Sequence, residues 1–286
     1  MQARPPYGMQ PLSAWSVAQR AMVRGVFTDI DDTLTQNGHI TTDARAALDA
    51  LQAAGIRVIA STGRPIGGCL KHLSGEHGAP WPVDAIVAEN GALAWIVPRD
   101  AQGQASGTPV KIYQQSATER AAQWIRMEAV AARVLREVPG VQLTRDMPLR
   151  ETDLTFDHGE FCQLDHATIQ HVVAVLQSAG MQTSVSSIHI HGCYNPFDKW
   201  LGARWILQVL DNLQSADCEA ALANWVCIGD SGNDQAMFRH FRYSVGVANI
   251  QRHAARMQVF PQYITQASHG SGFAEMAQAL LSARTP

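Results

Sequence analysis

The sequence predicts an α/β protein with a Rossmann-like parallel-sheet core and an inserted α+β cap domain. Short apolar runs alternate with helical patterns in the first third of the chain, and the same alternation returns near residue 198. Between these regions, hairpin-like segments are mixed with helices. The 286 residues leave room for one core plus one insertion.

The first region has the pattern of alternating strands and helices. Residues 23–30 and 56–62 are apolar runs typical of buried strands, and residues 82–91 predict a third strand. Thr41 is an N-cap candidate for the intervening helix, which Gly55 is placed to end. Strand–helix–strand units with short connections imply right-handed crossovers and therefore a parallel sheet.

The pattern of strands and helices changes after residue 90. Residues 92–97 and 110–115 flank a turn-rich stretch and predict a hairpin, and residues 117–138 predict a long helix. Strand and helix patterns then alternate over 152–192, which indicates an α+β unit with its own antiparallel sheet. The predicted domains are a poorly ordered leader at 1–20, a core at 21–90 and 193–286, and a cap at 91–192.

The composition is that of a globular protein. Hydrophobic residues make up 46% of the chain and charged residues 16%, with a formal net charge of -3. The chain has no surplus of basic residues that would indicate nucleic-acid binding. It also has no run of about 18 apolar residues that would indicate a membrane span. The five cysteines are scattered and never form a CxxC pair. We expect a cytoplasmic monomer or homodimer with reduced thiols and a small substrate as its partner.

Polar residues follow three predicted strands at the point where each strand ends. The first ends in Asp29 and Asp31, the second is followed by Thr62 and Gly63, and a later one ends in Asp230. Because ligands of an open parallel sheet bind at the carboxyl ends of its strands, we expect these groups to converge. A divalent cation would offset the repulsion between the carboxylates. Oxygen ligands without a nearby histidine favour Mg2+ over zinc.

A magnesium ion beside a free carboxylate suits phosphoryl chemistry. The metal offsets the charge of the phosphate oxygens, so that an anionic nucleophile can approach. An aspartate can be that nucleophile and pass through an aspartyl-phosphate. The hydroxyl of Thr62, the backbone N–H groups around Gly63, and Lys199 at the start of a helix are candidates to hold the remaining oxygens.

Four segments resemble, in order, the motifs of the haloacid dehalogenase-like hydrolases. They are FTDIDDTLT, ASTGR, the DK of NPFDKW, and CIGDSGNDQAMF. Any one of these motifs alone would be weak evidence for the resemblance, but four motifs in the family's order are strong evidence. The α+β cap between the second and third motifs is similar to that of subclass IIB, which holds the Cof-type and the sucrose- and trehalose-phosphate phosphatases.

The resemblance implies a role for each matching residue. Asp29 would be the nucleophile and a magnesium ligand. Asp31 would be the general acid and base, with its backbone carbonyl also on the metal. The other implied roles are phosphate binding by Thr62 and Lys199, metal ligation by Asp230, and support of the site by Asn233 and Asp234. One departure is Asp32, where many members have glycine.

Residues of the cap and its border are candidates for substrate contact. Arg150 and Asp153 would recognise a sugar or a second anionic group, or else form only a surface ion pair. His189, His191 and Cys193 alternate and so share one face of a strand. That spacing suits zinc, but without a fourth ligand the face more simply borders the core or the substrate pocket. Two further candidates follow strands of the core: Arg64 and Asn90.

Three functions are compatible with these residues. The first is a magnesium-dependent phosphatase that hydrolyses a small phosphorylated metabolite, a sugar phosphate, through an aspartyl-phosphate. The second is a phosphomannomutase-type phosphotransferase, which passes the same group to another hydroxyl. The third is a catalytically idle phosphosugar-binding protein. Asp29, Asp31 and Lys199 together argue against the third, since an idle pocket has no need for a nucleophile.

Overall fold

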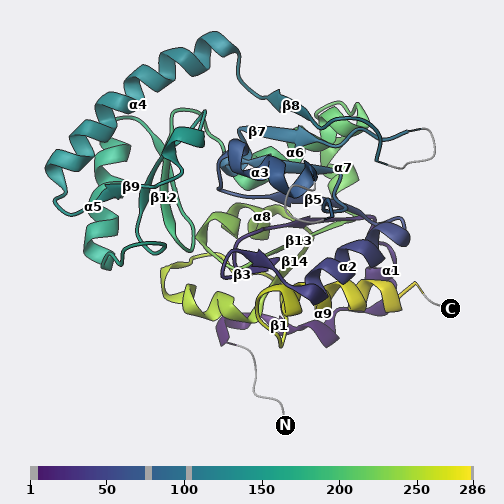
Figure 1. Ribbon diagram of the computed structural model, residues 1–286. Helices are drawn as coiled ribbons and strands as arrows, with labels where there is room; N and C mark the ends of the chain where they lie inside the picture. Colours follow the sequence, from purple (N-terminus) through teal and green to yellow (C-terminus); the bar gives the residue numbers. More distant parts are fainter. Residues whose placement is uncertain (1–5, 75–78, 101–104, 285–286) are drawn as a thin grey trace.

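The core of the protein is one large sheet. The computed structural model describes residues 6–74, 79–100 and 105–284. Within these ranges the sheet has nine strands in the order β1-β15-β14-β13-β2-β5-β6-β7-β8 (Figure 1). Pairing is parallel from β1 to β6 in that order, whereas β7 and β8 add on antiparallel. The strand bounds are β1 Gln10–Pro11, β2 Gly25–Thr28, β5 Arg57–Ser61, β6 Ala85–Ala88, β7 Leu93–Ile96, β8 Val110–Tyr113, β13 Trp225–Gly229, β14 Tyr243–Gly246 and β15 Tyr263–Ile264.

Helices cover both faces of this sheet and bury its apolar side chains. One face carries α2 (Thr42–Ala53), α3 (Ile66–Ser74) and α9 (His269–Ser282). The other face carries α6 (Lys199–Asp211), α7 (Cys218–Leu222) and α8 (Gln235–His240). As predicted, the Thr41 side chain caps α2, and Gly55 follows its end with a φ of 69°. The α/β class predicted from the sequence is confirmed.

The cap forms a separate layer with its own hydrophobic core. Its antiparallel sheet has the order β11-β12-β10-β9 among the described residues. The bounds are β9 Gln142–Leu143, β10 Leu154–Asp157, β11 Gln182–Val185, β12 His189–Cys193, α4 Ala117–Glu137 and α5 His166–Ser178. Both helices pack on this sheet around Phe156, Val134 and Leu176. Figure 1 shows this layer, in teal, beside the core.

The boundary between core and cap differs from the predicted one. The sequence places residues 91–192 in the cap, but the hairpin of β7 and β8 extends the core sheet instead. Its pairing covers the edge of β6, which would otherwise expose unpaired backbone groups. The predicted hairpin is correct, and part of its turn, residues 101–104, lies outside the described residues. A hairpin pattern cannot reveal which of two sheets it joins.

The N-terminal segment also differs from expectation. Residues 1–20 were predicted to be a poorly ordered leader, but the described part, from residue 6, packs on the core. β1 pairs with β15 at the sheet edge, and α1 (Val17–Ala21) contacts α9. Trp15 is fully buried and stacks on Tyr263 at 5.3 Å. An aromatic side chain of this size stabilises the segment through the apolar area that it buries.

No helix in the described ranges is both long and apolar enough to cross a membrane. Two further short strands, β3 (Thr35–Gln36) and β4 (His39–Ile40), form a small hairpin after β2.

Candidate active site

The carboxyl ends of three neighbouring strands meet at one edge of the core sheet. Asp29 follows β2, Thr62 follows β5, and Asp230 follows β13, and these strands lie side by side. The parallel register pairs Thr28 with Ala60, so the residues beyond these positions emerge at the same level. The sheet thus brings together acidic and hydroxyl groups that are far apart in the sequence.

Three buried carboxylates form a compact group at this edge. Asp29, Asp230 and Asp234 each place one oxygen within 4.8 Å of the others. Lys199, fully buried at the start of α6, donates to Asp29 at 2.5 Å and to Asp234 at 2.7 Å. One ammonium among three carboxylates leaves an excess of negative charge in a site that water hardly reaches.

The protonation equilibria reflect first the burial of these carboxylates and then their mutual repulsion. Burial raises the pKa of Asp29 to about 8, even though Lys199 acts to lower it. Burial also raises the pKa of Asp230 well above its usual range. The Oδ1 atom of Asp230 has no hydrogen-bond partner within the described part of the chain. A buried all-oxygen group with an unsatisfied acceptor fits a hard divalent cation such as magnesium.

The loop after β13 holds this group in place. One oxygen of Asp234 accepts from the N–H groups of Asp230 at 3.0 Å and Ser231 at 3.1 Å. The Ser231 hydroxyl donates to the side chain of Asn233 at 3.1 Å. A Cβ atom at Gly229 would lie 2.3 Å from the carboxyl carbon of Asp234, so only glycine lets the loop fold back so closely.

The turn after β5 provides a second polar surface. The buried hydroxyl of Thr62 accepts from the N–H of Arg64 at 3.0 Å. Asn90, in the left-handed region with a φ of 53°, donates its N–H to the Thr62 carbonyl at 3.0 Å. Its side-chain oxygen accepts from the amide of Asn233 at 3.0 Å. Asn90 therefore joins the β5 turn to the β13 loop.

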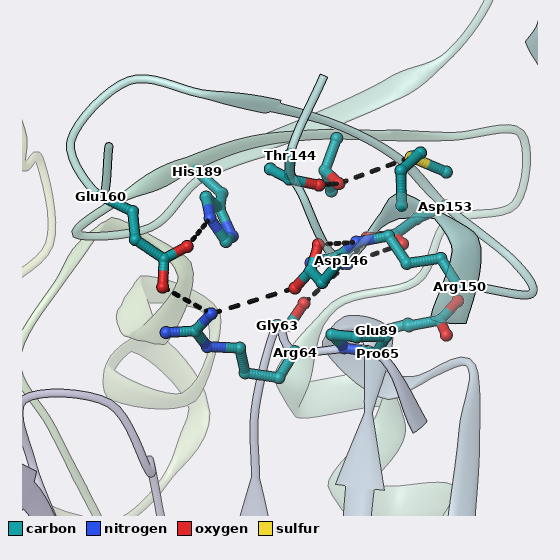
Figure 2. Close-up of polar contacts among 12 residues, drawn as sticks. Gly63, Arg64, Pro65, Glu89, Thr144, Asp146, Arg150, Asp153, Glu160 and His189 are labelled. Carbon is teal, nitrogen blue, oxygen red and sulfur yellow. Dashed lines mark hydrogen bonds and ion pairs between the residues drawn. The ribbon is translucent and has the colours of Figure 1, made fainter. Parts of the chain in front are cut away.

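Arg150 and Asp153 connect the cap to this turn. Arg150 donates to Asp153 and to the backbone carbonyl of Gly63, both at 2.9 Å, and also pairs with Asp146 at 3.1 Å (Figure 2). Its side chain is fully buried. The interpretation as a surface ion pair is therefore wrong, because these charges are enclosed between cap and core. Their geometry makes them positioning groups for the Gly63 turn.

The histidines of β12 lie at the border between cap and core, where both line a cavity together with Asp29. His189 contacts Glu160 at 2.8 Å, and His191 contacts Asp153 at 2.9 Å. The thiol of Cys193 donates instead to a backbone carbonyl. In the part of the chain that the structure describes, the three aspartates are the only group of possible metal ligands found together. These contacts favour the strand face at the cap–core border over the zinc interpretation.

Arg64 links Asp31 to the cap. Its guanidinium donates to both carboxylate oxygens of Asp31, at 3.0 and 3.1 Å, and to Glu160 at 2.9 Å. Figure 2 shows this guanidinium between Glu160 and Asp146, the latter 3.9 Å away. The side chain of Asp31 therefore pairs with Arg64 and is not a member of the three-carboxylate group.

Three carboxylates at the junction of cap and core were not predicted from the sequence: Glu89, Asp146 and Glu160. Glu89, which follows β6, accepts from the N–H groups of Glu151 at 3.1 Å and Thr152 at 2.7 Å. An acid directly after an apolar strand was the signal at Asp29, and the same signal could have identified Glu89. Asp146 and Glu160 lie in irregular segments of the cap, where no comparable pattern marks them.

Asp32 adopts the left-handed conformation, with a φ of 57°. Aspartate is one of the few residues besides glycine that enter this region readily. The carbonyl of Asp32 accepts from Asn249 at 2.9 Å, and Asn249 also contacts Asp230 at 3.3 Å. The extra charge is thus compatible with the tight turn that glycine would make.

Comparisons with known proteins agree with this geometry. A family model described as haloacid dehalogenase-like hydrolase matches residues 26–117, which contain Asp29, Asp31 and Thr62. The similarity to the haloacid dehalogenase-like hydrolases thus lies in the first part of the core. The chain is 38% identical to YxeH of Bacillus subtilis, a protein named as a phosphatase, over 73 residues, which are 25% of this chain and 27% of that protein.

Two longer matches extend over most of the chain. It is 24% identical to phosphoglycolate phosphatase 1 of Saccharolobus solfataricus, over 91% of this chain and 96% of that protein. Its fold is similar to that of the sucrose-phosphatase of Synechocystis sp. PCC6803, solved with sucrose and phosphate. That likeness has a TM-score of 0.63 at 15% identity and covers 90% of this chain and 97% of the other. At this coverage the likeness in fold includes residues of both the core and the cap of this chain.

Proposed function

We propose that this protein is a magnesium-dependent phosphatase of the haloacid dehalogenase-like kind that acts on a small phosphorylated metabolite, a sugar phosphate, through an aspartyl-phosphate. The observation that carries the proposal is the position of Asp29, which contacts Lys199 and groups with the buried Asp230. A carboxylate, a fixed ammonium and an unsatisfied carboxylate oxygen suit the binding and attack of a phosphate. The phosphatase names of the two curated relatives support it.

In the first proposed step, a carboxylate oxygen of Asp29 attacks phosphorus. The new O–P bond forms as the bond to the leaving oxygen breaks, and Asp31 donates a proton to that oxygen. A bound magnesium ion would offset the negative charges of the phosphate and the carboxylates; Asp29 and Asp230, with the backbone carbonyl of Asp31, would hold it.

In the second step, water replaces the aspartate on phosphorus. Asp31, now ionised, takes a proton from the attacking water, and the bond between phosphorus and Asp29 breaks. Phosphate leaves and Asp29 returns as a free carboxylate. In both steps the ammonium of Lys199 and the hydroxyl of Thr62 would hold the non-reacting oxygens, with backbone N–H groups near Gly63.

The cap must move for a substrate to enter. The cavity lined by Asp29, Asp31, His191 and Asn233 has a volume of about 10 Å³. That is roughly the space needed for one water molecule and far too little for a phosphate ester. We infer that the structure corresponds to a closed arrangement, in which the cap shields the acyl-phosphate from bulk water.

Phosphate release from a panel of phosphomonoesters tests this function. The panel would contain glucose 6-phosphate, glycerol 3-phosphate, phosphoglycolate and p-nitrophenyl phosphate, each with magnesium and with EDTA. We expect magnesium-dependent release by the wild type and none by Asp29→Asn. The matched control is Asp49→Asn, at an exposed aspartate paired with Arg45, which should keep full activity. Release without metal, or by Asp29→Asn, would contradict the proposal. Formation of isomerised sugar phosphate would instead indicate a mutase.

A further inference from the structure

His191 presents an unpaired nitrogen to the candidate site. Its imidazole is 3% exposed, and its Nδ1 atom lies 2.9 Å from an oxygen of Asp153. Its Nε2 atom is buried and has no hydrogen-bond partner among the described residues. The ring lies against the β5 turn, because a Cβ atom at Gly63 would be 2.9 Å from the ring. His191 also lines the small cavity that contains Asp29.

The surroundings decide what this nitrogen can do. Arg150 fixes the Asp153 carboxylate at 2.9 Å, so this carboxylate accepts a hydrogen bond from the Nδ1–H group of His191 and orients the ring. With the hydrogen on Nδ1, the Nε2 atom carries a lone pair and is an acceptor. Burial lowers the pKa of His191 to about 4, which keeps the ring neutral near pH 7.

The lone pair on the Nε2 atom of His191 determines which group of a substrate can bind there. A buried polar atom without a hydrogen bond is costly, so a group that satisfies it on binding gains affinity. The ionised oxygens of a phosphate are acceptors themselves and would be repelled by the lone pair. The complementary partner is a hydroxyl group, which the leaving group of a sugar or polyol phosphate carries close to its ester bond.

We propose that His191 is a specificity-determining residue, whose Nε2 atom accepts a hydrogen bond from a hydroxyl of the leaving group. The site thereby selects phosphate esters of polyhydroxylated compounds. Asp153 and Arg150 are positioning residues that hold the ring toward the site. This inference rests on the phosphatase function proposed above, and it names the chemical feature by which the enzyme would choose its substrate.

The test compares one ester with hydroxyl groups and one without. The esters are the better substrate of glucose 6-phosphate and glycerol 3-phosphate, and p-nitrophenyl phosphate. In His191→Phe, which keeps a planar ring but has no acceptor, we expect kcat/KM for the hydroxylated ester to fall about 10- to 100-fold. For p-nitrophenyl phosphate we expect a change below about 3-fold, since that ester never made the contact.

Two further variants make the result specific. His191→Gln offers an amide oxygen near the position of Nε2 and should recover most of the lost kcat/KM, and it replaces His191→Phe if that variant does not fold. His171→Phe, at an exposed position of α5, is the matched control and should resemble the wild type.

Three outcomes would overturn the inference. One is an equal loss on both esters, which would indicate a role toward the phosphate or the fold. The second is no loss on either. The third is a wild type that hydrolyses p-nitrophenyl phosphate without favouring any hydroxylated ester; this would leave the phosphatase function intact. A wild type inactive on every ester would instead refute the proposed function itself.

Discussion

Arg64 holds both carboxylate oxygens of Asp31, at 3.0 and 3.1 Å, while its third nitrogen bonds Glu160 of the cap at 2.9 Å. One guanidinium thus connects the proposed general acid with the element that closes the site. Two parallel N–H donors fix the plane of a carboxylate, which a single contact cannot do. The orientation of the Asp31 carboxylate therefore depends on Arg64 and, through Glu160, on the position of the cap.

Removing Arg64 should impair the proton transfer selectively. In Arg64→Ala we expect kcat on a sugar phosphate to fall about 10- to 100-fold, because a misdirected acid protonates a poor leaving group inefficiently. On p-nitrophenyl phosphate, whose leaving group needs little protonation, the fall should be below about 5-fold. Steady-state kinetics on both esters measure this difference.

Two controls accompany this experiment. Arg64→Lys keeps the charge but not the two-donor geometry, so it should recover only part of the activity. Arg133→Ala removes a partly exposed arginine that pairs with Glu137 on α4 and should leave both rates unchanged. An equal or faster rate of Arg64→Ala on the sugar phosphate would show that Arg64 does not position Asp31 for catalysis.

The buried carboxylate of Asp230 predicts a metal-dependent stability. Its Oδ1 atom lacks a partner among the described residues, and burial raises its pKa, so a bound cation should stabilise the native state. At a magnesium concentration about 100 times the Kd, we expect a gain near 2.7 kcal/mol in the free energy of unfolding of the wild type. Asp230→Asn should lose most of that gain, whereas Asp49→Asn should keep it. Thermal melting with magnesium and with EDTA measures both, and a wild type that does not respond to magnesium contradicts the cation site.

Glu89 should stabilise the junction between core and cap. Its carboxylate accepts from the N–H groups of Glu151 and Thr152 and from the Thr152 hydroxyl at 2.5 Å. Glu89→Ala leaves these buried donors unpaired, so we expect the free energy of unfolding to fall by about 2–4 kcal/mol in urea titrations. Glu137→Ala, at an exposed position of α4, should change it by less than about 0.5 kcal/mol. A loss at Glu89 no larger than at Glu137 would argue against this role.

The buried His191 also predicts a pH dependence of stability. Burial lowers its pKa to about 4 from an ordinary value of 6.5, so below pH 6.5 the unfolded chain binds a proton that the native state does not. Its contribution to stability is therefore present above pH 6.5 and is lost as the pH falls toward 4.

Paired unfolding measurements isolate this contribution. Between pH 7.5 and 5, the wild type should lose roughly 2 kcal/mol more than His191→Phe in the free energy of unfolding. His171→Phe, at an exposed histidine, should follow the wild type. Parallel pH profiles for all three proteins would mean that His191 is protonated as easily in the native state as in the unfolded chain.

Much of the core and the edge that carries the candidate site could be predicted from local pattern. Apolar runs that end in Asp29 and Asp230 predicted both the strands and the edge where they meet, because strand ends in a parallel sheet share one edge. The N-cap Thr41 and the terminating Gly55 set the bounds of α2 through contacts within a few residues. Such features depend on neighbours in the sequence, and so they are visible there.

Long-range partners were not visible. Whether β7 and β8 join the core or the cap depends on which sheet has an open edge, and both sheets accept a hairpin of this pattern. Trp15 lies in a segment without periodicity, and only the aromatic side chains of two distant strands give it a place to pack. An arginine carries the same charge on the surface as in a buried cluster. The sequence around Arg150 therefore cannot show which of these two environments its side chain has.

By itself, the sequence determined the class of fold, the strand ends that carry the acids, and the order of the four motifs, since each is written in short stretches of chain. Only the tertiary structure decided that Arg64 pairs with Asp31, that Glu89 holds the cap connection, and that His191 turns an unpaired nitrogen to the site. Those relationships join residues from different elements, and they arise only when buried charges and polar groups must find partners within the folded chain.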